Sequence, residues 1–103
     1  MVKPDEQLLH DLWCTDRDVF DKKIVEEPME LALGYMHFLD GKITREELAK
    51  EVADVIVQIE KIYYRVPGIK KLAMKELGKV VLNLEEEVYY NPNAHIETFH
   101  KDS

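Results

Sequence analysis

Apolar residues recur three or four positions apart along four segments of the chain, the spacing of one face of an α-helix. Short polar or Gly/Pro-containing stretches separate these segments: Thr15-Asp16-Arg17-Asp18, Asp40-Gly41-Lys42 and Pro67-Gly68. The sequence therefore predicts an all-α chain of four helices, at about residues 4–14, 19–39, 44–64 and 69–90.

A short loop joins the second and third segments. Asp40-Gly41-Lys42 is a turn signal, and Thr44 followed by Glu47 has the form of a capping box at the start of a helix. Helices with so short a connection are expected to be antiparallel neighbours, so these segments predict an αα-hairpin. Pro28 lies inside the first of the two, and that helix is expected either to begin near Pro28 or to kink there.

Both hairpin helices are apolar over most of their circumference. The third segment has a predicted core face and further apolar residues on its far side. The core face is Leu48, Val52, Val55, Ile59, Ile62 and Tyr63, and the far side is Ala49, Ala53, Val57 and Tyr64. A chain of 103 residues suffices for one domain but cannot cover two such helices. We expect a single helical domain, with residues 91–103 as a C-terminal tail, whose four-helix bundle core is completed by homodimerisation.

The polar residues that remain on the hairpin helices are mostly acidic. Glu26, Glu27 and Glu30 lie on the first helix, and Glu51 and Asp54 lie on the second. Residues three apart share one face of a helix, and the hairpin would bring the two clusters to similar heights. Neither cluster is expected to have a basic partner on its own face. Converging carboxylates repel one another unless a cation lies between them, so the pattern predicts a metal site.

Composition narrows the possible partners. The net charge of −7 argues against a nucleic-acid-binding protein, which would show a basic face. The single cysteine, Cys14, excludes an internal disulfide and fits a reducing compartment. No apolar run approaches the length of a membrane span. We expect a cytoplasmic protein that binds neither nucleic acid nor membrane, with Cys14 as a small apolar residue that no His or acidic partner activates.

The spacing of the acids resembles that of a known family. Glu26-Glu27-x-x-Glu30 is followed, after twenty residues, by Glu51-x-x-Asp54 and the aliphatic residues Val55-Ile56-Val57. This is similar to the signature of the MazG-like all-α nucleoside triphosphate pyrophosphohydrolases, over roughly residues 22–83. The resemblance implies hydrolysis of a nucleoside triphosphate, (d)NTP, to the monophosphate and pyrophosphate with Mg²⁺, for which Mn²⁺ could substitute. It also implies assembly as a homodimer or homotetramer.

The resemblance further implies roles for individual acids. Carried over by position, the metal ligands would be Glu27, Glu30, Glu51 and Asp54. Glu26 and Glu27 would be the catalytic residues, with Glu26 either adding a ligand or holding the attacking water.

A second set of residues would bind the substrate phosphates. Many members of the family supply a Lys-x-Asn pair from the fourth helix. Here Asn83 fits, but Val81 stands at the lysine position, so Lys79, one turn before Asn83, is expected to substitute. The Glu27-Pro28 sequence also departs from the family pattern and, with Val81, bears on catalytic activity more than on the fold.

Two alternatives to this function follow from the sequence. One is a specialised relative that acts on a single deoxynucleotide such as dUTP or dCTP. The other is a helical dimerisation module whose site is degenerate, which Val81 and Pro28 would favour.

Overall fold

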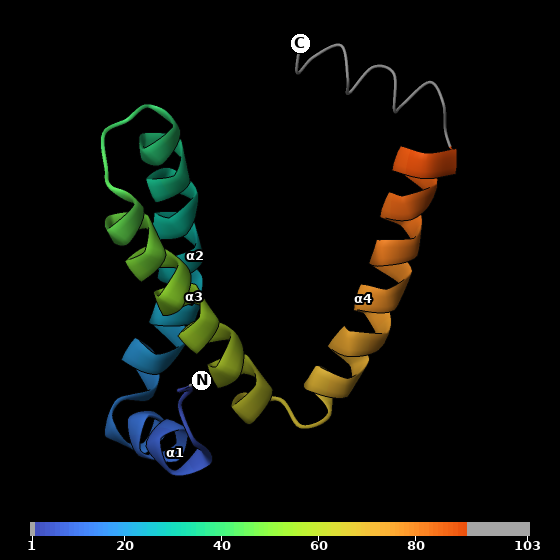
Figure 1. The fold of residues 1–103 in the computed structure, drawn as a ribbon. Coiled ribbons are helices and arrows are strands. Elements are labelled where there is room, and N and C mark those ends of the chain that lie inside the picture. Colours follow the sequence, from blue (N-terminus) through green and yellow to red (C-terminus); the bar gives the residue numbers. More distant parts are fainter. Residues whose placement is uncertain (1, 91–103) are drawn as a thin grey trace. The chain divides into compact units, whose positions relative to one another are not determined.

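The computed structural model describes residues 2–90, and the predicted tail at residues 91–103 lies outside the described residues (Figure 1). Among the described residues every regular element is a helix, so the all-α prediction is confirmed. The elements are α1 (Glu6–Thr15), α2 (Arg17–Leu39), α3 (Arg45–Arg65), α4 (Ile69–Glu85) and a terminal π-helical turn, η1 (Glu86–Tyr90).

The chain divides into two compact units between Pro67 and Gly68. The first contains α1, α2 and α3, and the second contains α4 and η1. Within residues 2–90, no helix has the length and apolar character needed to cross a membrane.

Side chains at the helix ends explain where the helices start. The Asp5 carboxylate accepts a hydrogen bond from the Leu8 backbone N–H at 2.8 Å and caps α1. Asp16 ends α1 and also caps α2, because its carboxylate accepts from the Val19 N–H at 3.2 Å. One residue thus separates the two helices, and α2 begins two residues before the predicted position. The predicted capping box between Thr44 and Glu47 is confirmed at the start of α3.

Helix α2 runs unbroken through Pro28 for 23 residues, so it does not begin there. A proline inside a helix removes one backbone hydrogen bond, and the remainder of α2 tolerates that loss. The side chain of Pro28 is exposed, on the surface of the hairpin.

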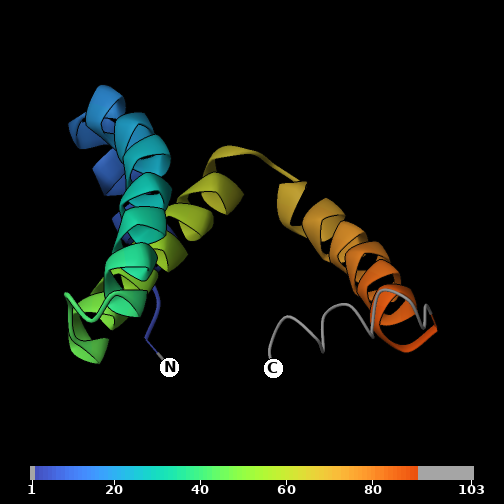
Figure 2. The ribbon, with the colours of Figure 1, turned by 90° about the horizontal axis from the view of Figure 1, so that it is seen from above.

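Helices α2 and α3 lie side by side and antiparallel, as both views of the ribbon show (Figures 1 and 2). Gly41 turns the connection between them with φ +74°, a conformation that glycine adopts without strain. Helix α1 packs where α2 begins and α3 ends. The predicted αα-hairpin is therefore confirmed.

The first unit has a small hydrophobic core. Among the described residues, Leu9 and Phe20 are the only buried hydrophobic side chains. Val52 and Ile59, which were predicted to face the core, are each 41% exposed, so that part of the prediction was wrong. The reason is that α3 turns polar side chains toward α2 instead, and two of these, Gln58 and Lys61, are buried.

Candidate metal centre

Three carboxylates converge between α2 and α3. Glu27 on α2 and Glu51 and Asp54 on α3 each offer one oxygen, and these three oxygens all lie within 4.8 Å of one another. The antiparallel hairpin creates this arrangement, because it sets the middle of one helix against the first half of the other. Oxygen ligands from two helices at such separations could hold a divalent cation.

Two oxygens in this cluster are buried and have no hydrogen-bond partner. They are Oε2 of Glu27 and Oε2 of Glu51. The Glu27 side chain as a whole is 10% exposed. Leaving a buried acceptor unsatisfied costs about 1–3 kcal/mol, and more when the group is charged. A cation between these oxygens would remove that cost, which is why the cluster is a candidate metal centre.

A glycine on α2 lets Glu51 approach closely. A Cβ atom placed on the buried Gly34 would lie 3.4 Å from Cγ of Glu51 and 3.9 Å from Cδ1 of Ile43. The stem of Glu51 therefore lies directly against the backbone of α2. An alanine Cβ would make ordinary van der Waals contact with Glu51, so only a side chain larger than that of alanine would press on it.

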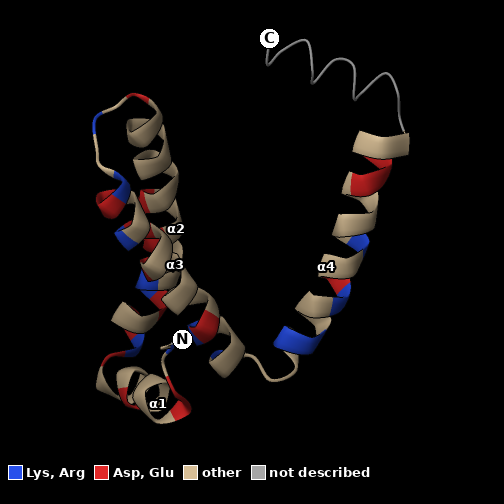
Figure 3. Ribbon diagram, viewed as in Figure 1, with Lys and Arg blue, Asp and Glu red and all other residues tan. Residues whose placement is uncertain are grey.

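Lysines flank the cluster, contrary to the prediction that the acids have no basic partner on their own faces. Lys50 Nζ lies 3.0 Å from Oδ2 of Asp54, and Lys23 Nζ lies 3.7 Å from Oε1 of Glu27. Both pairs span four residues of one helix. Residues four apart are neighbours on one face of a helix, so the prediction failed because this i,i+4 spacing was overlooked. Figure 3 shows acidic and basic residues close together along α2 and α3.

The other two predicted site residues of α2, Glu26 and Glu30, lie outside the converging set. Glu26 is paired with Lys22 at 3.5 Å and with Lys23 at 3.7 Å. Glu30 is exposed, and it lines a cavity together with Glu51. The structure thus brings together three of the four predicted ligands and leaves Glu30 at the edge of the site.

This cavity adjoins the candidate metal centre on the side of the hairpin loop. Its volume is about 250 Å³, and its walls are Glu30, Leu33, Gly34, His37, Ile43, Glu47 and Glu51. His37 was not assigned to any site from the sequence, although it lies three residues after Gly34 on the polar stripe of α2. A space of this size beside the carboxylates could admit part of a ligand.

A buried lysine was also missed. Lys61 is 5% exposed, its Nζ donates to Oε1 of Gln58 at 2.8 Å, and it lies 4.4 Å from the centre of the Phe20 ring. Burial lowers the pKa of Lys61, while the charges of Asp21 and Glu27 act in the opposite direction. Lys61 lies three residues after Gln58, on the same face of α3, and this spacing could have indicated from the sequence that the two side chains meet.

Cys14 lies beside His10, a contact that was not predicted from the sequence. Its Sγ lies 3.5 Å from Nε2 of His10, and Nδ1 of His10 lies 2.7 Å from the Tyr64 hydroxyl. Cys14 is also exposed rather than part of the core. The expectation of an unaccompanied apolar cysteine was therefore wrong.

The predicted phosphate-binding residues belong to the second unit. Lys79 is exposed and pairs with Glu76 one turn earlier on α4, with 3.1 Å between Lys79 Nζ and Glu76 Oε1. Asn83 lies one turn further on and is exposed.

Comparison with known proteins gives no relative: no protein-family model matches the chain, and neither a curated protein nor a solved structure matches it.

Proposed function

We propose that the protein is a Mg²⁺-dependent nucleoside triphosphate pyrophosphohydrolase, which converts a (d)NTP to the monophosphate and pyrophosphate. The observation that carries this proposal is the pair of buried, unpartnered oxygens on Glu27 and Glu51, with Asp54 beside them. Mg²⁺ binds to proteins through a few carboxylates and completes its coordination with water and substrate phosphates. Three carboxylates on a partly open surface suit that mode of binding, and Mn²⁺ could replace Mg²⁺ there.

Each acid has a proposed part in this reaction. Glu27, Glu51 and Asp54 hold the cation, and Glu30 adds a ligand from the wall of the adjoining cavity. Glu26 and Glu27 orient the attacking water. A bound Mg²⁺ offsets the triphosphate charge and makes water a better nucleophile. The resemblance in acid spacing supports these assignments, as does the convergence of three of the acids.

Two residues of α4 have a proposed role in binding substrate. Lys79 and Asn83 would bind phosphate oxygens, with Lys79 standing in for the lysine that Val81 replaces. The Lys79 ammonium is already paired with Glu76, so a phosphate would have to displace that exposed and weak ion pair.

We also propose that a second copy of the chain covers the apolar surface of the hairpin and completes a four-helix bundle. Val52, Ile56 and Ile59 form a stripe on α3, and each is at least 41% exposed. Val25, Met29 and Met36 form a second stripe on α2 and are at least 62% exposed. Exposed apolar residues that gather in stripes, rather than singly, are typical of interaction surfaces. Neither stripe includes a charged residue, which suits burial between two copies. A homotetramer would need a further interface in addition to this one.

A cytoplasmic location is part of the same proposal. A single cysteine, with no possible partner in the chain, fits a reducing compartment in which nucleoside triphosphates are abundant.

The first prediction concerns turnover. We expect pyrophosphate release from at least one of the eight common NTPs and dNTPs at millimolar Mg²⁺, and we expect this release to stop when the metal is chelated. Released pyrophosphate and the nucleoside monophosphate should appear in equal amounts, which separates this reaction from stepwise phosphate removal. Activity on a single deoxynucleotide, such as dUTP or dCTP, would identify the specialised relative.

One observation favours the non-enzymatic alternative. Lys50 and Lys23 supply positive charge to Asp54 and Glu27, so the cluster is partly neutralised without a metal. A helical dimerisation module with a degenerate site would need no more than this. The absence of turnover on all eight nucleotides, in a protein that is folded and dimeric, would support this alternative.

A further inference from the structure

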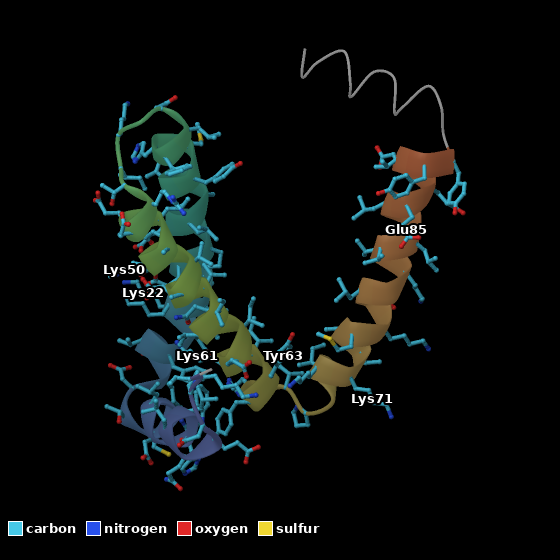
Figure 4. All side chains as sticks on the ribbon, viewed as in Figure 1. Lys22, Lys50, Lys61, Tyr63, Lys71 and Glu85 are labelled. Carbon is cyan, nitrogen blue, oxygen red and sulfur yellow. The ribbon has the colours of Figure 1, made fainter. Side chains whose placement is uncertain are left out.

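Lys50 is the positive charge most closely associated with the carboxylate cluster. Its Nζ donates a hydrogen bond of 3.0 Å to Oδ2 of Asp54. This hydrogen bond and the charge of Asp54 raise the pKa of Lys50, and the charges of Glu51 and Glu27 raise it further. The lysine therefore interacts with all three carboxylates while contacting one of them. Figure 4 labels Lys50 on α3.

A divalent cation and the Lys50 ammonium would compete for Asp54. Both are positively charged, and both would take the same carboxylate oxygens. The Lys50 side chain is 74% exposed and that of Asp54 is 35% exposed, so water screens their pairing. An exposed ion pair of this kind is weak, so a cation chelated by several carboxylates would displace it. Displacing Lys50 would also leave the fold intact, because little of its side chain packs against the protein.

We propose that Lys50 is the counter-ion that a divalent cation replaces at Asp54, and that the displaced ammonium then binds the phosphate oxygens of the substrate. This inference rests on the proposed function. It assigns a phosphate-binding residue on the same helix as two of the metal ligands, in addition to those proposed on α4. The Lys50 ammonium would neutralise the Asp54 carboxylate in the metal-free protein and the substrate phosphates in the complex.

The reach of the side chain supports this second role. Lys50 lies one turn before Asp54, and its ammonium already reaches the carboxylate that would hold the cation. A phosphate bound to that cation would place its oxygens within a few ångströms of the same point. A flexible lysine with three rotatable N–H donors can turn from the carboxylate to the phosphate without any movement of the backbone. Lys23 is less suited, because it divides its charge between Glu26 and Glu27, 3.7 Å from each.

The test measures two affinities that should change in opposite directions. Mg²⁺ alone is titrated calorimetrically into the metal-free protein, and inorganic tripolyphosphate is then titrated into the Mg²⁺-loaded protein. For Lys50→Met we expect Mg²⁺ to bind about two- to fivefold more tightly, which corresponds to the loss of one exposed competing ion pair. We expect tripolyphosphate to bind at least about tenfold more weakly. Lys50→Arg, which keeps the charge, should restore both affinities to within about threefold of the wild type.

Lys22 provides a matched control. It is 72% exposed and forms an ion pair at the same four-residue spacing, but with Glu26, which lies outside the converging carboxylates. Lys22→Met should leave the Mg²⁺ affinity unchanged. If Lys50→Met changes neither affinity, or weakens both, the proposed exchange of Lys50 from Asp54 to the phosphates is wrong, although the metal site itself is not refuted. A wild type that binds Mg²⁺ but not tripolyphosphate also refutes the exchange. A wild type that binds no Mg²⁺ refutes the proposed function and the exchange together.

Discussion

Replacing Glu51 by glutamine is expected to abolish Mg²⁺-dependent hydrolysis while leaving the protein folded. Glutamine has nearly the same shape, so the close contact with Gly34 is kept. The substitution removes the negative charge of Glu51, whose Oε2 is buried without a partner, together with one of three converging ligands. Losing a residue that merely orients a metal ligand typically costs 10–100-fold, so loss of the ligand itself should reduce turnover by at least about 100-fold.

Thermal unfolding with and without Mg²⁺ checks the same variant independently of activity. The wild type should gain stability with Mg²⁺, by about 2.7 kcal/mol at a hundredfold excess over the Kd. Glu51→Gln should be at least as stable as the wild type without metal and should gain little when Mg²⁺ is added. Glu46→Gln is the matched control, because Glu46 is an exposed acid on the same helix. A full Mg²⁺ shift in Glu51→Gln would show that Glu51 is not a ligand.

Placing a glutamate at Ile56 is expected to convert the assembly to folded monomers. Ile56 is 51% exposed in the described chain and lies two residues after Asp54, about 200° round the helix, so it faces away from that acid. In a symmetric dimer the new carboxylate would be buried once in each copy, without a partner. We expect the dissociation constant to rise at least about 100-fold. Val57, on the far side predicted from the sequence, is half-buried in the chain itself, so a charge there would also disturb the monomer.

Light scattering measures this outcome directly. The wild type should have at least twice the 12.1 kDa mass of one chain at micromolar concentration, and Ile56→Glu should have the mass of one chain with an unchanged helical circular dichroism spectrum. Ile56→Val, which keeps the site apolar, should remain associated. A wild type that is already a folded monomer would contradict the proposed bundle.

The helices and the hairpin could be predicted because their signals are local. A capping residue such as Asp16 or Thr44 accepts a hydrogen bond from a backbone N–H only three residues further along the chain. The turn at Gly41 lies between two segments whose apolar residues recur with helical spacing. The convergence of Glu27 with Glu51 also follows from two short-range facts, the spacing along each helix and the length of the loop.

The side chains around the acids were predicted less well. Lys23 and Lys50 each lie four residues before the acid that they contact, a spacing that puts the two side chains on one helix face, and this signal was overlooked. The core residues of α3 were also misjudged. Val52 and Ile59 were predicted to face the core, yet each is 41% exposed, whereas the polar side chains of Gln58 and Lys61 are buried. A buried polar pair of this kind is uncommon in a core, so there was little reason to expect it from the sequence.

The central claim is that Glu27, Glu51 and Asp54 bind one divalent cation, and a crystal grown with Mn²⁺ tests it most directly. An anomalous difference map recorded at the manganese absorption edge should show a peak between α2 and α3, within coordination distance of Oε2 of Glu27, Oε2 of Glu51 and an oxygen of Asp54. Lys50 should no longer contact Asp54 in that crystal. The absence of a peak at saturating Mn²⁺, with the Lys50–Asp54 ion pair retained, would contradict the account.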